Sequence, residues 1–227
     1  MNYVAPIKDM QFVLNELAGL KQIQRLPGCE DATDETVAAV LEENARFMGE
    51  VVAPLNRTGD VEPARWDNGR VITTPGFKQA FDAFVQAGWQ GVQHPGEFGG
   101  QGLPKLVAAP CMEMLQAANL SFALCPLLTD GAIEALLTAG SDEQKSTYIH
   151  RLIDGSWTGT MNLTEPQAGS DLAQVRTRAV PQGDGTFRLF GQKIFITFGE
   201  HDLAENIVHL VLARTPDAPE GVKGISL

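Results

Sequence analysis

The stretch MNLTEPQAGSDL, residues 161–172, decides the fold because the pattern of the chain changes there. An apolar, strand-like start runs into a proline and a turn of small residues, and the turn ends at Asp171. Thr164 and Ser170 carry hydroxyls that both donate and accept hydrogen bonds, and Gly169 lets a ligand approach the backbone closely. Such a turn can hold a phosphate or a polarised heterocycle through its N–H groups, although an ordinary surface turn explains the same residues.

Hydrophobic spacing predicts helices before this stretch. Thr33 is a capping residue, and apolar side chains then recur at three- and four-residue steps through residues 37–55. A Ser141–Gln144 capping box starts the last helix, which Gly155 ends. Further helices are expected after Pro75, from Pro104, and after Pro126 to about Ala139.

The hydrophobic period changes to that of strands after Ser156. Residues 175–179 alternate, PQGDG provides a turn, and TFRLF (186–190), KIFIT (193–197) and NIVHLVLA (206–213) are rich in strand-forming residues. This order predicts an α+β fold, with an all-helical N-terminal domain over residues 1–156 and an antiparallel β domain over residues 157–227. The chain stops at GVKGISL, which has the character of another strand, so we expect the β domain to be incomplete.

Composition narrows the class of protein. The 227 residues include 17 Lys plus Arg against 28 Asp plus Glu, a formal charge of -11 that argues against a nucleic-acid partner. Cys29, Cys111 and Cys125 have no metal-ligand spacing and suggest reduced thiols in a cytoplasmic protein. No secretory signal is visible, and the apolar run LSFALCPLL is too short to span a membrane. We therefore expect no metal and no membrane partner.

Four motifs together resemble one enzyme family. The segments LTEPQAGSD (163–171) and FGQKIFITFG (190–199) closely resemble the acyl-CoA dehydrogenase family, and the similarity extends to GWQGVQHPGEFGGQGLP (88–104) and GSDEQKSTYIHRLIDGSWTGTMNLTEP (140–166). The first residues resemble the longer bacterial members, some of which act on 3-methylthiopropanoyl-CoA. The resemblance implies a β-barrel-like middle domain and a further C-terminal helical bundle beyond Leu227.

The resemblance also implies an FAD site. Thr164 matches a threonine that hydrogen-bonds the pyrimidine side of the flavin, and Ser170 matches a serine near the pyrophosphate and the CoA part of the substrate. Phe195 replaces the tryptophan of many members, which retains an aromatic face and loses the indole N–H. The other implied flavin contacts are Met161, Leu163, Ile196 and Thr197.

The family places its catalytic base on helices after the β domain, so we expect the base beyond Leu227. Glu165 is interpreted as a structural carboxylate of the turn, and His94 as a solvated loop side chain. Gly99, Gly100 and Gly102 follow no strand–turn–helix unit, so they are not a dinucleotide-binding motif. Residues 121–128 correspond to the acyl pocket, where Phe122, Cys125 and Leu128 are candidate contacts, although ordinary helix packing explains them equally well.

The function that the resemblance implies is dehydrogenation of an acyl-CoA thioester, either 3-methylthiopropanoyl-CoA or a fatty acyl-CoA, by a homo-oligomer. Electrons would pass to an electron-transfer flavoprotein. A flavin oxidase of the same fold would instead consume oxygen, and a non-catalytic binding or assembly module would never retain flavin. Oxygen uptake and flavin colour therefore separate the three alternatives.

Overall fold

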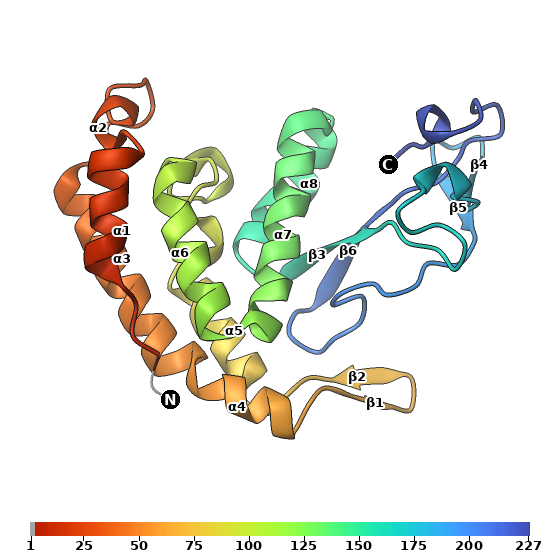
Figure 1. Ribbon diagram of the computed structural model, residues 1–227. Coiled ribbons are helices and arrows are strands. Elements are labelled where there is room, and N and C mark those ends of the chain that lie inside the picture. The colour runs from red at the N-terminus through yellow and green to blue at the C-terminus, as the bar shows by residue number, and fades with distance from the viewer. Residues whose placement is uncertain (1–2) are drawn as a thin grey trace.

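A computed structural model describes residues 3–227, and helices form the first part of this chain (Figure 1). Helices α3, α6 and α7 stand side by side, with α3 packed on α6 and α6 packed on α7 (Figure 1). Two π-helical turns, η1 (Val13–Leu17) and η2 (Met48–Val52), continue α1 and α3. The helices are α1 (Ile7–Phe12), α2 (Leu20–Ile23), α3 (Asp34–Phe47), α4 (Pro54–Val61), α5 (Phe77–Gln86), α6 (Lys105–Ala118), α7 (Leu120–Ala139) and α8 (Asp142–Ile153).

Local capping residues start and end several of these helices as the sequence predicts. The Thr33 hydroxyl accepts the Thr36 N–H at 3.1 Å before α3. Ser141 and Gln144 form both hydrogen bonds of a capping box before α8. After α8, Gly155 adopts a φ of 75°, the left-handed conformation that favours glycine at a helix end. The boundaries of these helices therefore follow from nearby residues.

Helix α7 begins earlier than predicted. The expected start after Pro126 is wrong, because α7 begins at Leu120 and contains this proline. Asn119 caps the helix by accepting the Phe122 N–H at 3.1 Å. A proline inside a helix removes a single backbone donor, and here Pro126 is buried in the packed interior. The cap and the packing thus outweigh the proline as a boundary signal.

Helix α7 is also long and apolar enough, by length and composition, to cross a membrane. It packs against α6, α8 and strand β3 (Trp157–Asn162), and many of its side chains are buried in these contacts. Core helices of soluble proteins pass the same test of length and composition. The packing identifies α7 as the central helix of the described chain.

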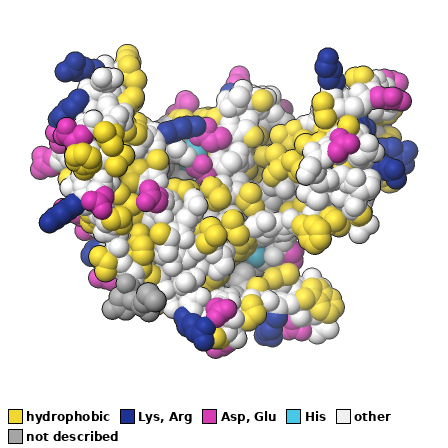
Figure 2. Space-filling view, viewed as in Figure 1, with side chains coloured by type: hydrophobic (Ala, Val, Ile, Leu, Met, Phe, Trp, Pro, Cys, Tyr) yellow, Lys and Arg dark blue, Asp and Glu magenta, His cyan; other side chains and the backbone are white. Residues whose placement is uncertain are grey.

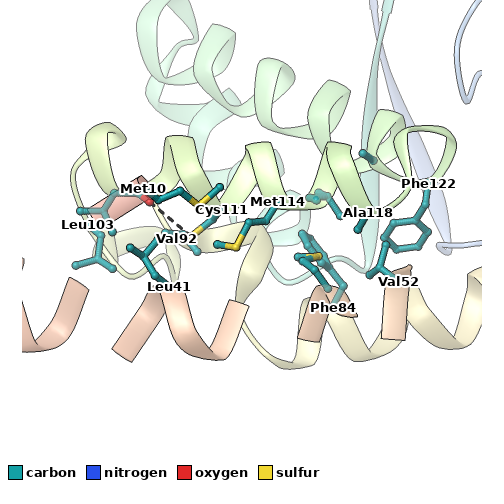
Figure 3. Close-up of a cluster of buried hydrophobic side chains, with 14 of the residues drawn as sticks. Met10, Leu41, Val52, Phe84, Val92, Leu103, Cys111, Met114, Ala118 and Phe122 are labelled. Carbon is teal, nitrogen blue, oxygen red and sulfur yellow. Dashed lines mark hydrogen bonds between the residues drawn. The ribbon is translucent and has the colours of Figure 1, made fainter. Parts of the chain in front are cut away.

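One hydrophobic core joins the N-terminal helices (Figure 3). The ring of Phe122 makes edge-to-face contacts with Phe77 and Phe84, at centroid distances of 5.4 and 6.2 Å. Leu203, from far along the chain, belongs to the same core and is 1% exposed. The side chains labelled in Figure 3 are Met10, Leu41, Val52, Phe84, Val92, Leu103, Cys111, Met114, Ala118 and Phe122.

The strands form three separate two-stranded sheets within residues 3–227. Strands β1 and β2 are antiparallel, as are β4 and β5, whereas β3 and β6 are parallel. The helix-then-strand order of the predicted α+β fold is confirmed, and the division at residue 156 stays a prediction. The strands are β1 (Arg65–Asp67), β2 (Arg70–Ile72), β3 (Trp157–Asn162), β4 (Arg178–Pro181), β5 (Phe187–Phe190) and β6 (Asn206–Val211).

The expectation of an antiparallel, barrel-like domain is correct only for the β4–β5 pair. Pairing of β3 with β6 is parallel, because the chain makes a long crossover between them that includes β4 and β5. Residues 3–227 show no closure of a barrel. The predicted strand over residues 193–197 is absent from the described chain as well. Phe195 and Phe198 have φ angles of 57° and 50°, which bend the backbone out of an extended path.

The N-terminal part is not all-helical, because β1 and β2 form a hairpin. Asn68 and Gly69 at its tip have φ angles of 48° and 88°, as a two-residue hairpin turn requires. The hairpin projects beside the loop that leads into β6 (Figure 1). The Asn-Gly pair is the sequence signal that could have predicted it.

Strand β3 lies directly on α7 because a glycine faces the helix. The Gly159 N–H donates to the Thr129 hydroxyl at 3.1 Å, and that hydroxyl donates to the Cys125 carbonyl at 2.9 Å. A Cβ atom added at Gly159 would lie 2.4 Å from Ala132 Cβ. Only glycine therefore permits this approach of strand and helix.

We expect Gly159→Ala to lower the free energy of unfolding by about 1–3 kcal/mol, because overpacking forces the strand away from the helix. Urea unfolding measures the change. Gly131→Ala is the matched control, since Gly131 lies in α7 with no neighbour within 4 Å of an added Cβ. This control should be stabilising by roughly 0.5–1 kcal/mol, as expected for glycine in a helix. Equal stability of the Gly159 variant and the unchanged chain would contradict the close packing.

Candidate functional site

The two segments that the sequence marks as a site lie side by side. Lys193 Nζ donates to the Leu163 carbonyl at 3.1 Å, and the Ile194 N–H donates to the Thr164 carbonyl at 3.0 Å. The first segment leaves the end of β3, and the second arrives after β5. Residues separated by about thirty positions along the chain are therefore joined at one place, because partly buried backbone groups of one segment find hydrogen-bond partners in the other.

The carboxylate of Glu165 holds this junction together. Its side chain is 3% exposed and accepts the backbone N–H groups of Arg176 at 2.8 Å and Thr177 at 3.0 Å. Lys193 Nζ lies 2.9 Å from Glu165 Oε1, and Gln167 Nε2 lies 2.6 Å from Oε2. Both carboxylate oxygens are therefore occupied by donors from three separate parts of the chain.

The turn itself closes on the same residue. The Glu165 N–H donates to the Ala168 carbonyl at 2.9 Å, and the Ala168 N–H donates back to the Glu165 carbonyl at 3.0 Å. Further along, Asp171 Oδ1 accepts the Ala173 N–H at 3.0 Å, so this aspartate caps the next helical turn. The turn is thus rigidly built while its outer face is open.

Burial by itself raises the pKa of Glu165, but hydrogen bonds from Thr177, Arg176 and Lys193 outweigh it and lower the pKa to about 2. A carboxylate with so low a pKa, and with both oxygens bound, is a poor proton acceptor near pH 7. The interpretation of Glu165 as a structural carboxylate of the turn agrees with this geometry.

The aromatic residue of the second segment is presented to solvent. The Phe195 side chain is 88% exposed, and its left-handed backbone directs it away from a regular strand path. Ile196 is half-buried and Thr197 is exposed. The exposed Phe195 ring therefore presents a flat apolar face to solvent.

The first segment places its predicted contacts beside this face. Met161, Leu163 and Thr164 are half-buried, whereas Ser170 is exposed on the turn. Apart from Gly169 itself and the residues on either side of it, no heavy atom lies within 4 Å of the position that a Cβ of Gly169 would occupy. The structure therefore leaves room at the turn for a ligand to approach the backbone.

The candidate acyl contacts lie on α7 in different environments. Phe122 is 0% exposed and Cys125 is 1% exposed, so both belong to the core, whereas Leu128 is half-buried. Burial also raises the pKa of the Cys125 thiol, which keeps it protonated. Leu128 lies one residue before Thr129, which bonds β3. Of the three residues, Leu128 is thus placed best to contact a ligand.

His94 was expected to be solvated, and this expectation is wrong because the side chain is 0% exposed. Its Nε2 lies 2.8 Å from Asp130 Oδ1 and its Nδ1 lies 3.7 Å from Glu134 Oε1, although neither contact has hydrogen-bond geometry. Gln93 also contacts Asp130 at 2.6 Å, and Lys105 contacts Glu134 at 2.6 Å. The contacts of Gln93 and His94 hold the glycine-rich loop against α7, and the contact of Lys105 joins the start of α6 to α7.

A cleft of about 280 Å³ lies next to this cluster, between α6, α7 and the loop before α6. Its walls are mainly apolar, and Gln93, Lys105 and Asp130 provide polar groups. The predicted flavin and acyl contacts are not among its lining residues.

Within residues 3–227, no group of three or more His, Cys, Asp or Glu side chains could hold a metal ion.

Sequence reasoning missed Lys193, whose Nζ bonds both Leu163 and Glu165. The lysine precedes the recognised residues of its motif and has no local pattern that marks it. Lys193 itself is mostly buried, with 9% of its side chain exposed.

On the face shown in Figure 2, Lys and Arg side chains lie in separate spots and not in one patch.

We expect stability to fall as the pH drops from 4.5 to about 2, because the folded-state pKa of Glu165 lies below its ordinary value. In the unfolded chain the Glu165 carboxylate takes up its proton at a higher pH than in the folded chain. Ionised Glu165 therefore contributes about 3 kcal/mol to the free energy of unfolding above pH 4.5, and this contribution is lost towards pH 2. Unfolding by urea as a function of pH measures it. Glu165→Gln should remove most of this dependence and lower stability at pH 7. An unchanged pH profile in that variant would show that other groups cause the loss.

Comparison with known proteins identifies the family of the chain. Residues 34–156 match the acyl-CoA dehydrogenase N-terminal domain, and residues 160–227 match the acyl-CoA dehydrogenase middle domain. The chain is 57% identical over 227 residues to 3-methylmercaptopropionyl-CoA dehydrogenase of Ruegeria pomeroyi, covering 100% of the chain and 39% of that protein. It is 36% identical to the broad-specificity linear acyl-CoA dehydrogenase FadE5 of Mycobacterium tuberculosis, covering 100% of the chain and 37% of the relative.

Solved structures agree in fold. The chain matches a structure described as the electron transferring flavoprotein of Acidaminococcus fermentans with a TM-score of 0.70 and 29% identity, over 86% of the chain and 47% of the other. An acyl-CoA dehydrogenase from Bacillus anthracis complexed with FAD matches with a TM-score of 0.65 and 25% identity, over 82% of the chain and 30% of that protein. The chain spans about 40% of the length of its relatives. It belongs to the acyl-CoA dehydrogenase family.

Proposed function

We propose that this chain forms the N-terminal and middle parts of an FAD-dependent enzyme that introduces an α,β-double bond into an acyl-CoA thioester. The observation that carries the proposal is the junction of residues 161–170 with residues 193–197, held by Lys193 and Ile194. Family membership and the solved relative that contains FAD support the choice of cofactor.

The residues present fit a flavin. Phe195 offers an exposed aromatic face, and the open backbone at Gly169 suits an approaching planar or anionic group. FAD, when bound, supplies the acceptor for the hydride that leaves the β-carbon of the thioester. Thr164 would donate a hydrogen bond to the pyrimidine side of the ring, and Ser170 would contact the pyrophosphate and the CoA part. Fixed neutral donors stabilise the negative charge of a reduced ring without rearrangement.

The second segment completes this proposed site. Ile196 and Thr197 would border the ring beside Phe195, and Met161 and Leu163 would contact it from the first segment. Strand β3, which carries Met161, packs on α7. Glu165 does not act as the base in this proposal, because its oxygens already accept four hydrogen bonds.

For the substrate, we propose 3-methylmercaptopropionyl-CoA, since the 57% identical relative carries that name. Leu128, and less directly Phe122 and Cys125 behind it, would border the acyl chain from α7. For the electron acceptor, we propose an electron-transfer flavoprotein, as the similar structure from Acidaminococcus fermentans suggests. A cytoplasmic homo-oligomer is the assembly that we propose for the whole protein.

We expect Thr164→Ala to weaken FAD binding to the whole protein and to slow flavin reduction, by about 1–3 kcal/mol, because a buried acceptor on the flavin loses its donor. Titration of FAD and the rate of bleaching by substrate measure the two effects. Thr164→Ser keeps the hydroxyl and is the matched control. A Thr164→Ala protein with unchanged affinity and reduction rate would contradict the assignment of Thr164.

Residues 1–227 alone should form no enoyl-CoA from any acyl-CoA, even with FAD in excess. The described carboxylate nearest to the site is bound in the turn, and cofactor contacts are spread over the length of a dinucleotide. An assay with an artificial electron acceptor and detection of the enoyl product tests this. Turnover that Glu165→Gln abolishes would overturn both the structural role of Glu165 and the expected location of the base.

A further inference from the structure

The loop of residues 198–204 directly follows the second site segment and is fastened to the helical part of the chain. Asp202 Oδ1 accepts the Thr73 hydroxyl at 2.6 Å and the Thr73 N–H at 3.2 Å. Lys78 Nζ donates to the Leu203 carbonyl at 2.8 Å. The Leu203 side chain is buried in the core of the N-terminal helices. This loop therefore connects the site to residues more than a hundred positions earlier in the chain.

A buried histidine fixes the same loop to β3. His201 Nδ1 accepts the Leu203 N–H at 3.1 Å, which leaves the proton on Nε2, and this nitrogen donates to the Thr158 hydroxyl at 2.9 Å. Burial lowers the pKa of His201 to about 4, so the ring is neutral at pH 7. Phe198 packs against this ring at a centroid distance of 5.6 Å. The loop is thus anchored on both the helices and the strand.

The backbone has unfavourable dihedral angles where the second site segment runs into this loop. Phe195 and Phe198 both adopt left-handed φ angles, which residues with a Cβ rarely do unless their surroundings impose it. Gly199 is confined as well, since an added Cβ would lie 3.0 Å from Ile196 Cγ2. Ile194 is tied to Thr164 at one end of this segment, and Asp202 is tied to Thr73 at the other.

We propose that Asp202 is a positioning residue of the cofactor site. By binding Thr73, it holds the loop against the helices and so keeps residues 195–197 in the strained arrangement that presents Phe195 to the flavin. The role in flavin binding rests on the proposed function, whereas the restraint of residues 195–197 does not. The N-terminal helices thus set the geometry of a cofactor site that lies on the β part.

Hydrogen–deuterium exchange of the purified chain tests the restraint without any cofactor. In Asp202→Ala, exchange of residues 194–199 should accelerate about tenfold, as expected for hydrogen bonds worth about 1.4 kcal/mol, whereas α3 and α6 should not change. Thr73→Val removes the hydroxyl and keeps the N–H, so it should give a smaller change in the same segment. Asp202→Asn keeps an acceptor oxygen and should restore slow exchange. Asp217→Ala, in an exposed segment after β6, is the control.

FAD titration of the same variants tests the link to the cofactor. Asp202→Ala should weaken FAD binding about tenfold and alter the flavin absorption bands, and Asp202→Asn should recover both, while the unfolding midpoint of the helices stays constant. Unchanged exchange at residues 194–199 in Asp202→Ala and Thr73→Val would overturn the proposal. Faster exchange at residues 194–199 in Asp202→Ala, with unaltered FAD affinity and an unaltered flavin spectrum, would also overturn it. If the unchanged chain and the whole protein bind no FAD, the proposed function fails, and the exchange data alone decide whether Asp202 restrains the segment.

Discussion

The buried carboxylate of Glu165 is the interaction on which the arrangement of the site depends. A carboxylate that is only 3% exposed must be fully hydrogen-bonded, and here its donors come from the turn, from the chain before β4 and from Lys193. Because Lys193 also bonds the Leu163 carbonyl, the same pair sets the distance between the two site segments. Loss of one partner would leave a buried charge unpaired, which is costlier than the loss of an ordinary surface ion pair.

Contacts with the helices position this junction in turn. Gly159 lets β3 lie against α7, and the loop after the second segment is fastened to Thr73 and Lys78 near the start of α5. The helical part therefore contributes to the geometry of the site although the predicted flavin contacts lie on the β part.

Features set by neighbouring residues could be predicted, and features set by distant contacts could not. The caps at Thr33 and Ser141 and the helix end at Gly155 depend on a few adjacent positions, and all three are confirmed. The parallel pairing of β3 with β6 and the bent path at Phe195 and Phe198 depend on contacts between remote segments. Hydrophobic period and residue type predict a strand over residues 193–197, but they carry no information on the contact of Asp202 with Thr73 that fastens the loop after this segment. His94 was misjudged for the same reason, since its acidic neighbours lie on α7. The site segments were recognised through motifs, whereas Lys193 required the structure.

The central claim is that residues 161–170 and 193–197 form one flavin-binding surface. The most direct measurement is a titration of the isotopically labelled chain with FAD, followed by backbone NMR, which detects weak binding residue by residue. If the claim is right, the backbone amide chemical shifts of both segments change and saturate at the same FAD concentration. The amides that line the cleft between α6 and α7 then change little. Shifts confined to that cleft, or to the first segment without the second, would contradict it.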